Sequence, residues 1–221
     1  MDKGADDKSK LEKLKNRMEI NNTVILSIAT LAITWCSYQS ILWNGIQTFK
    51  LVESNQDNRL AQDKSMLIVQ HQAMDKNVVI SFVNSVMERN TQKVNSSLHY
   101  MRPELANILK AWLDLDPAVN AEAPPHPMEM KEYQLLFEKD AAESRELLKQ
   151  SDIKWKEAQQ ANTNSDRYSL FTVIFSMVMF LGAIATKMSL VRLSFTLVVV
   201  SGFICITTLI ILFLLMPLAT E

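Results

Sequence analysis

Three stretches of this sequence contain no charged residue, and each is long enough to cross a lipid bilayer. They cover residues 20–45, 168–186 and 193–218. About 20 apolar residues, each rising about 1.5 Å along a helix, span the hydrocarbon core of a membrane. We therefore expect an all-α integral membrane protein with three transmembrane helices. A charged segment, residues 1–19, precedes the first, and a short turn, residues 187–192, joins the last two.

The segment between the first two spans, residues 46–167, has room for one modest domain. It carries 15 Lys and Arg and 18 Asp and Glu residues. This near balance leaves no basic patch of the kind that binds nucleic acid. The whole chain has only 4 glycines, which disfavours Gly-rich phosphate loops and favours helix. We expect a helical domain and no nucleic-acid partner.

Basic residues beside the spans predict the orientation. Eight Lys and Arg lie before the first span or in the turn at 187–192, against five near the membrane on the opposite side. The positive-inside rule then places the N-terminus in the cytoplasm and residues 46–167 outside the cell inner (plasma) membrane. Tyr38 and Trp43 close the first span, where amphipathic aromatic side chains favour the interface with water. We expect both to be interfacial anchors.

The intervening segment reads as a helical hairpin with a coiled-coil-like stem. Neither proline nor glycine occurs from residue 46 to residue 100, so one helix is expected to run out of the first span over this whole stretch. A further short helix is expected to begin at Pro103, because proline fits a first helical turn and disfavours helix in the residue before it. Four prolines between residues 117 and 127 predict a proline-rich tip at 116–128.

Both long helices of this hairpin carry a face that repeats at intervals of three and four residues. On the return helix this face mixes Ala and Ser with large residues, so the partner helix can approach closely at some layers. Antiparallel pairing is the expected way to bury both faces. The outgoing face comprises Leu60, Leu67, Met74, Val78, Phe82 and Val86, and the return face comprises Tyr133, Phe137, Ala141, Ser144, Leu148, Ser151, Trp155, Ala158 and Asn162.

The first span also carries a face of small polar residues, here named the hydroxyl stripe. Small residues let membrane helices approach, and hydroxyls bond across the contact. The stripe predicts helix packing, both among the three spans and between copies in a homo-oligomer. The alternative is an oligomeric channel, in which several copies of the stripe line a pore. Proton pumping is disfavoured, because the spans contain no Asp, Glu, Lys, Arg or His. The stripe consists of Thr23, Ser27, Thr30, Thr34, Ser37 and Asn44.

Patterns that carry catalysis or bind metals are missing from the sequence. Its three histidines are isolated, and both cysteines, Cys36 and Cys205, fall inside predicted spans. No HExxH, paired-Cys, P-loop or GxSxG pattern occurs. We expect a non-enzymatic protein without a cofactor or metal, acting as a scaffold or sensor whose exposed tip contacts a protein partner. The candidate contact residues are Trp112, Asp116, Pro124, Pro125, Pro127 and Tyr133.

Several short motifs together suggest a known group of proteins. The first span ends in Trp35-Cys-Ser-Tyr-Gln-Ser-Ile-Leu-Trp43, and Asn164-Ser-Asp-Arg-Tyr168 leads into the second span. Between them lie Trp112-Leu-Asp-Leu-Asp-Pro117 and Ala123-Pro-Pro-His-Pro-Met128. Over most of its length the chain resembles bacterial three-span inner-membrane proteins of unknown function, with W-x-x-Y-Q, W-L-x-x-D-P…A-P-P-x-P and D-x-Y patterns. The resemblance implies no activity. It implies that the proline loop and the Trp/Tyr/Gln cluster are recurrent features of a fold.

Overall fold

The computed structural model describes residues 3–117, 119–120 and 122–219, with side chains from residue 12 onward. Within these residues the chain is helical and contains no strand, as the all-α prediction requires. Three helices, α1, α5 and α6, are long and apolar enough to cross a membrane. The elements are α1 (Lys3–Met87), α2 (Thr91–Tyr100), α3 (Pro103–Asp114), the 3-10 turn η1 (Pro127–Glu129), α4 (Lys131–Leu135), α5 (Glu138–Lys187) and α6 (Val191–Leu215).

The chain divides into two compact units. The first, here called the span unit, combines Met1–Leu51 with Trp155–Glu221 and so contains the first part of α1, the end of α5 and all of α6. The second, the intervening unit, is Val52–Lys154.

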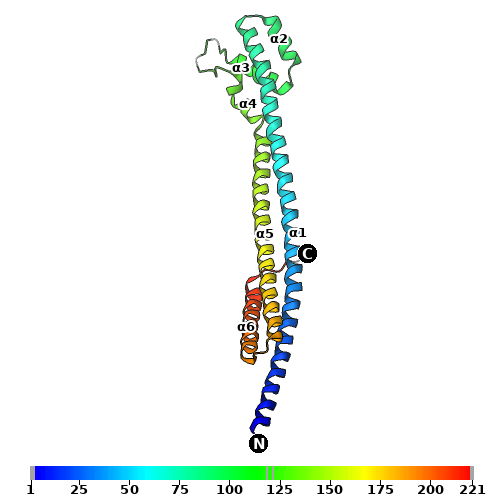
Figure 1. Cartoon of the computed structure of the whole chain (residues 1–221). Helices are drawn as coiled ribbons and strands as arrows, with labels where there is room; N and C mark the ends of the chain where they lie inside the picture. Colours follow the sequence, from blue (N-terminus) through cyan, green and yellow to red (C-terminus); the bar gives the residue numbers. More distant parts are fainter. Residues whose placement is uncertain (1–2, 118, 121, 220–221) are drawn as a thin grey trace. The chain divides into compact units, whose positions relative to one another are not determined.

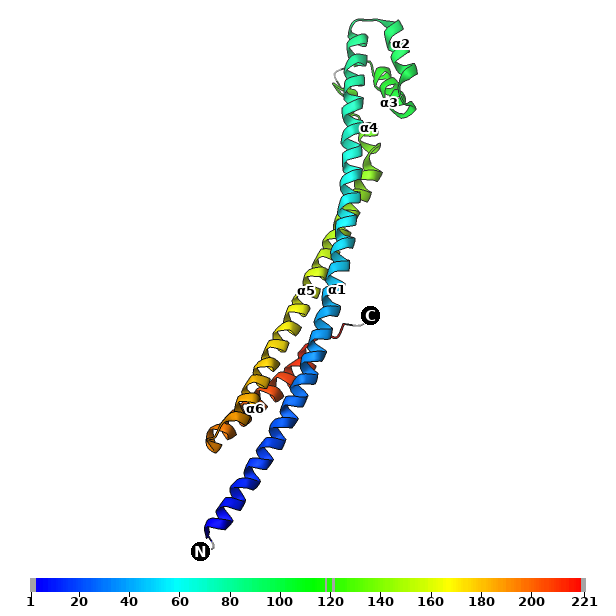
Figure 2. The same cartoon turned by 45° about the vertical axis from the view of Figure 1, so that its right-hand side comes forward.

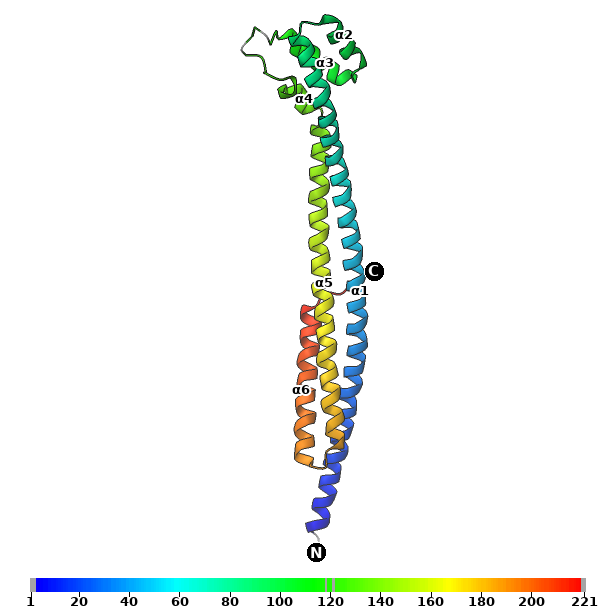
Figure 3. The same cartoon turned by 45° about the horizontal axis from the view of Figure 1, so that its top comes forward.

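In the span unit, α1, α5 and α6 lie side by side (Figure 1, Figure 3). Helix α1 turns a face of small residues, such as Ala29 and Cys36, towards the other two helices, and this face makes room for the large side chains of α5. The buried core consists of Ala29, Ala32, Cys36, Tyr168, Phe171, Phe175, Val178, Cys205 and Leu212.

Helices α1 and α5 approach closely at Gly182. The Asn22 side-chain amide donates a hydrogen bond to the Gly182 carbonyl at 2.9 Å. A Cβ atom added at Gly182 would lie 2.7 Å from Leu26 Cδ2 and 2.8 Å from Asn22 Oδ1. A side chain at this position would therefore require Leu26 and Asn22 to shift.

Serine hydroxyls join α1 to α5 as antiparallel neighbours in each unit. In the span unit, Ser165 Oγ donates to the Ser40 carbonyl at 3.0 Å, and Ser40 Oγ donates back to the Ser165 carbonyl at 3.2 Å. In the intervening unit, Ser54 and Ser151 exchange the same two hydrogen bonds at 2.9 Å each. We name these reciprocal pairs the serine rungs. Small side chains bring the two backbones close enough for a hydroxyl to reach the opposite carbonyl.

The intervening unit has a second core, in which α2, α3 and α4 pack around the last turns of α1 (Figure 2). As predicted, α3 begins at Pro103, which occupies its first turn. Trp112 lies inside this core, and its indole N–H donates to the Pro124 carbonyl at 2.8 Å, which ties the proline loop to α3. The buried residues are Val79, Phe82, Leu105, Ile108, Leu109, Trp112, Met130, Tyr133 and Phe137.

The prediction that one helix runs on to residue 100 is wrong. Helix α1 ends at Met87, and Arg89 adopts the left-handed conformation with a φ of 54°. The Asn90 amide donates to the Ser85 carbonyl and the Arg89 amide to the Val86 carbonyl, a pair of bonds that closes a helix C-terminus. The Asn90 side chain then caps α2 by accepting a hydrogen bond from the Lys93 amide. The sequence gives one local sign of this break, which is Asn90, a residue type that favours the helix N-cap. Glycine and proline, which more often mark the end of a helix, are absent here.

The buried face of each long helix also differs from its prediction at several positions. On α1, Phe82 is buried, but Leu60, Leu67 and Met74 are exposed, and Ala61 lies in the contact instead. On α5, Leu148 and Trp155 are also exposed, contrary to the prediction. Ser144, Ser151 and Ala158 are buried as expected. Small residues occupy the contact because they permit the serine rungs, which longer side chains would prevent.

We expect the serine rung of the intervening unit to contribute measurably to stability. Changing both Ser54→Ala and Ser151→Ala removes two interhelical hydrogen bonds without adding volume, and should lower the free energy of unfolding by about 1–2 kcal/mol. Ser151→Leu should cost more, because it separates the backbones. Thermal unfolding in detergent micelles measures both effects, with exposed Ser96→Ala as the control. Wild-type stability of Ser151→Leu would contradict the close approach.

We expect a Cβ atom at Gly182 to weaken the span unit. Gly182→Ala should lower the midpoint of thermal unfolding, because the new methyl group displaces Leu26 and disturbs the Asn22 hydrogen bond. Gly45→Ala is a matched control on α1, since no atom lies within 4 Å of a Cβ atom added there. That variant should be neutral or slightly stabilising, because alanine favours helix over glycine by about 1 kcal/mol. Equal effects of the two changes would show that close packing at Gly182 is unimportant.

Candidate functional site

A buried aspartate, hydrogen-bonded to an arginine and a tyrosine, ties three elements of the intervening unit together. Asp75 of α1 is buried, and its Oδ2 atom accepts hydrogen bonds from Arg102 Nη2 and, at 3.1 Å, from the Tyr133 hydroxyl. Arg102 is the residue before Pro103 at the start of α3, and Tyr133 lies on α4. Because a buried charge is costly without a partner, Asp75 holds all three segments in one arrangement.

Arg102 has a second set of contacts. Its guanidinium carbon lies 5.7 Å from the centre of the Phe137 ring, within the range of a cation–π interaction. Its Nε atom is buried and has no hydrogen-bond partner in the part of the chain that the structure describes. Arg102 therefore carries one unused N–H donor beside its ion pair.

Tyr133 keeps its proton in this environment. Burial, followed by the negative charge of Asp75 and the hydrogen bond to it, raises the pKa of the Tyr133 phenol above its ordinary value of 10.0. The phenol ring packs edge-on against Phe137, with ring centres 5.6 Å apart. Tyr133 is thus a stable hydrogen-bond donor to Asp75.

A groove of about 440 Å³ opens beside the Asp75–Arg102 pair. This volume falls within the range of about 300–1,000 Å³ found for ligand sites in proteins. The surface of its wall is mostly apolar and includes two methionines, although five of the ten lining residues are polar or charged. The lining residues are His71, Met74, Asp75, Val78, Ser81, Ser97, Tyr100, Met101, Arg102 and Leu105.

An exposed apolar face of α1 leads into this groove. Leu60, Leu67, Met74 and Val78 follow one another at intervals of seven, seven and four residues, which places them on one side of the helix. All four are exposed, and the last two line the groove. Opposite them, Tyr100 is also exposed. Lys64 and His71 lie between the others at helical spacing, so exposed apolar side chains adjoin one another only at Met74 and Val78, beside the groove, where such side chains mark interaction sites.

Three of the six residues predicted to contact a partner are buried. Trp112 and Tyr133 are each only 4% exposed, so the expectation of exposed surroundings for them is wrong. Both side chains can be buried because their polar atoms form hydrogen bonds. The Trp112 indole N–H donates to the Pro124 carbonyl, and the Tyr133 hydroxyl donates to Asp75 Oδ2. Of the other candidates, Pro127 is buried, Pro124 is half-buried, and Asp116 and Pro125 are exposed.

The hydroxyl stripe lies beside the contact face of α1 rather than on it. Thr23, Ser27, Thr30 and Thr34 are exposed, and each hydroxyl donates to the carbonyl four residues earlier in α1. The Thr30 hydroxyl also lies 3.7 Å from Met179 Sδ of α5. The other stripe members are Ser37, which is half-buried, and Asn44, which is exposed. Packing between copies through the stripe stays a prediction.

Three motif residues of the span unit meet at the tail that follows α6. The Trp43 indole N–H and the Tyr168 hydroxyl both donate to the Pro217 carbonyl, at 3.3 and 3.1 Å. Gln39 Oε1 accepts a hydrogen bond from the Ala219 amide at 2.9 Å. Sequence reasoning missed this contact, because a backbone carbonyl so distant in the chain leaves no local signal. Tyr38 is exposed, and the interfacial roles of Tyr38 and Trp43 stay predictions.

Comparison with known proteins identifies no relative of this chain. No protein-family model, curated protein or solved structure matches it. The resemblance to bacterial three-span membrane proteins therefore remains an expectation. Function has to be inferred from the groove and from the helices themselves.

We expect the Asp75–Tyr133 hydrogen bond to make stability fall at high pH. Above about pH 10 an unfolded tyrosine loses its proton, while folded Tyr133 keeps it, so stability falls by up to about 1.4 kcal/mol per pH unit until the folded pKa is reached. Tyr133→Phe should cost about 1–2 kcal/mol near neutral pH and should flatten the decline above pH 10. Denaturant midpoints measured across this range test both effects, with exposed Tyr100→Phe as the control. An unchanged slope in Tyr133→Phe would contradict the assignment.

Proposed function

We propose that this chain is a non-enzymatic scaffold or sensor, anchored in the inner membrane, whose intervening unit binds a helix of a protein partner. The observation that carries the proposal is the methionine-containing groove at Arg102, continuous with the exposed apolar face of α1. No catalytic group is needed for this role.

The surface of α6 supports membrane anchorage. Its outward side chains are large and apolar, among them Phe203, Ile206 and Phe213, and all three are exposed. Exposure of such a surface to water is unfavourable, whereas the apolar tails of lipids can surround it without this cost. The positive-inside rule supports the orientation, with the intervening unit outside the membrane on the side opposite the N-terminus.

The serine rung of Ser54 and Ser151 supports a helical-hairpin arrangement of the intervening unit. It fixes the outgoing and returning helices side by side, and Ser144 Oγ adds a further bond to the Ala61 carbonyl at 2.9 Å. The neighbouring face of α1, from Leu60 to Val78, stays exposed and available to another molecule.

An amphipathic helix is the partner chemistry that suits this face. Such a helix presents apolar side chains at intervals of three, four and seven residues, which matches the spacing of Leu67, Met74 and Val78. Methionine side chains adapt to different partners because they are flexible and polarisable. Arg102 itself lines the groove, so a partner bound there lies against it. Since Arg102 also anchors α3 to α1 through Asp75, binding there can be sensed by the whole intervening unit.

Photocrosslinking in cells tests the docking face. A benzophenone amino acid at Met74 should give an adduct with another protein, and Val78→Glu should abolish it, because a charge in the groove opposes an apolar contact. Met66 is the matched control, since it lies on the same helix outside the groove and is 62% exposed against 66% for Met74. Equal adduct yields at both positions would contradict the proposal. Adducts consisting only of two copies of this chain would make the groove a self-association surface instead.

A second candidate function is the oligomeric channel lined by the hydroxyl stripe. It is favoured by the exposure of the stripe, which α5 and α6 leave largely uncovered. If the stripe lines a pore, Thr30→Leu or Thr34→Leu should alter conductance in planar bilayers while the oligomer stays intact. If the stripe only packs between copies, the same changes should weaken association, and the wild-type chain should show no conductance.

A further inference from the structure

A second exposed face of α1 lies on the side of the helix away from the groove. Val78 lines the groove, and Ile80 follows it by two residues, which places the two side chains on opposite sides of a helix. From Val69 to Met87 this face repeats at alternating intervals of four and three residues, and every member except the half-buried Val83 is exposed. We name it the α1 seam; its members are Val69, Ala73, Lys76, Ile80, Val83 and Met87.

The spacing of the α1 seam indicates the kind of partner that fits it. Alternating steps of four and three residues are the heptad spacing of a coiled coil, in which each side chain inserts between residues of a second helix with the same repeat. Five of the six members are apolar, and Lys76 is the exception. A single lysine in such a series lowers stability and fixes the register of the pair. The partner is therefore a helix with a heptad repeat.

The positions that flank the α1 seam allow this partner to be a second copy of the chain. In coiled coils the flanking positions select the partner by charge, and like charges there oppose self-pairing. None of the flanking positions carries a charge here. An amide can both donate and accept a hydrogen bond, so each can bond to its own counterpart. The exposed flanking residues are Gln70, Gln72, Asn77 and Asn84.

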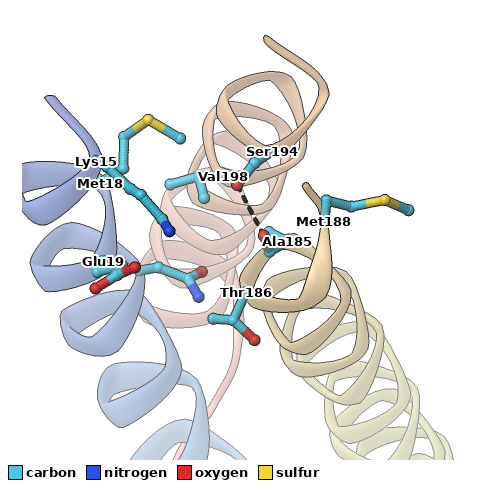
Figure 4. A pocket seen from close by; sticks show the side chains of 9 residues that line it. Lys15, Met18, Glu19, Ala185, Thr186, Met188, Ser194 and Val198 are labelled. Carbon is cyan, nitrogen blue, oxygen red and sulfur yellow. Dashed lines mark hydrogen bonds between the residues drawn. The ribbon is translucent and has the colours of Figure 1, made fainter. Parts of the chain in front are cut away.

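The same series occurs in the span unit. Counting back from Val69 in threes and fours leads to residues of α1 that are exposed there, with Leu31 73% and Ile41 70% exposed. The side of α1 that faces α5 and α6 is different, since Lys15 and Met18 lie on it, around a small pocket (Figure 4). A second copy of α1 supplies a helix with the matching repeat to each unit. The exposed members in the span unit include Val24, Ser27, Leu31, Thr34, Tyr38 and Ile41.

We propose that two copies of this chain pair along the α1 seam, in parallel and in register. The parallel direction rests on the membrane anchorage proposed above, because two anchored copies leave the membrane in the same direction. In register, each residue lies opposite its own counterpart. Ala73 then allows the two backbones to approach, and Ile80 packs against Ile80 of the second copy. The groove beside Val78 stays on the outside of the pair, open to the other partner.

Disulfide crosslinking of the full-length chain in membranes tests the direction and the register. With Cys36→Ala and Cys205→Ala as the background, Ala73→Cys and Met87→Cys should each form a disulfide-linked dimer on mild oxidation. An antiparallel pair brings at most one position opposite itself, so crosslinking at both positions requires a parallel pair. Val78→Cys, on the opposite side of α1, is the matched control. Equal crosslinking at Val78, or none at Ala73 and Met87, would overturn the proposal.

Sedimentation equilibrium in detergent measures the strength of the pair. Lys76→Leu should tighten dimerisation by about tenfold or more, because it replaces two facing ammonium groups by apolar side chains, and Ile80→Glu should weaken it by about as much. Lys110→Leu, which removes the same charge from an exposed position on α3, should leave the dimer unchanged. A Lys76→Leu variant that pairs no more tightly than the wild type, or equal tightening in Lys110→Leu, would contradict the seam.

The docking face and the α1 seam are tested apart by two substitutions. Ile80→Glu should abolish the dimer and preserve the adduct of a benzophenone at Met74 with another protein, whereas Val78→Glu should do the reverse. A dimer without the adduct contradicts the docking face alone, and the adduct without a dimer contradicts the seam alone. Release of the chain from membranes by alkaline carbonate contradicts the anchorage itself, whereas retention of a monomeric chain contradicts only the seam.

Discussion

The hydrogen bond between a serine hydroxyl and the carbonyl of a neighbouring helix is the interaction on which the pairing of α1 with α5 depends. A backbone carbonyl already bonded within its own helix has a second lone pair, so it accepts the hydroxyl at no cost to the helix. The bond needs a short side chain on each helix, which excludes large residues from the contact. Ser40–Ser165 and Ser54–Ser151 use this device in stretches of very different hydropathy. It does not rely on water being expelled, so it works in lipid and in solution alike.

The same preference for small residues explains which parts of the fold the sequence could predict. The three apolar helices and the start of α3 at Pro103 follow from residue type alone and were predicted. The faces of the helices were less predictable, because hydrophobic periodicity assigns the inside to the largest apolar residues. Here the inside of α1 is built from residues such as Ala61 and Ser54, and Leu60 and Leu67 face outward. The break at Arg89 escaped prediction because neither glycine nor proline marks it.

Two of the candidate contact residues, Trp112 and Tyr133, were expected to be exposed and are buried for a related reason. Tryptophan and tyrosine are enriched both at interfaces and in cores where their polar ends find partners. Trp112 and Tyr133 belong to the second class, since the N–H or hydroxyl of each donates a hydrogen bond to another residue of the same unit. No local signal distinguishes the two classes, because Pro124 O and Asp75 become neighbours only in the folded chain. The groove beside Arg102 likewise exists only once α1, α2 and α3 have come together.

The tail after α6 has a consequence for how the span unit is completed during synthesis. The Pro217 carbonyl receives donors from Trp43 on α1 and from Tyr168 on α5, which the ribosome produces much earlier. Until α6 arrives, these two polar groups lack this acceptor, and a donor that folding buries without a partner is costly. The last helix to be made therefore supplies the acceptor that the first two helices lack. A chain that stops short of Pro217 would leave both donors without it.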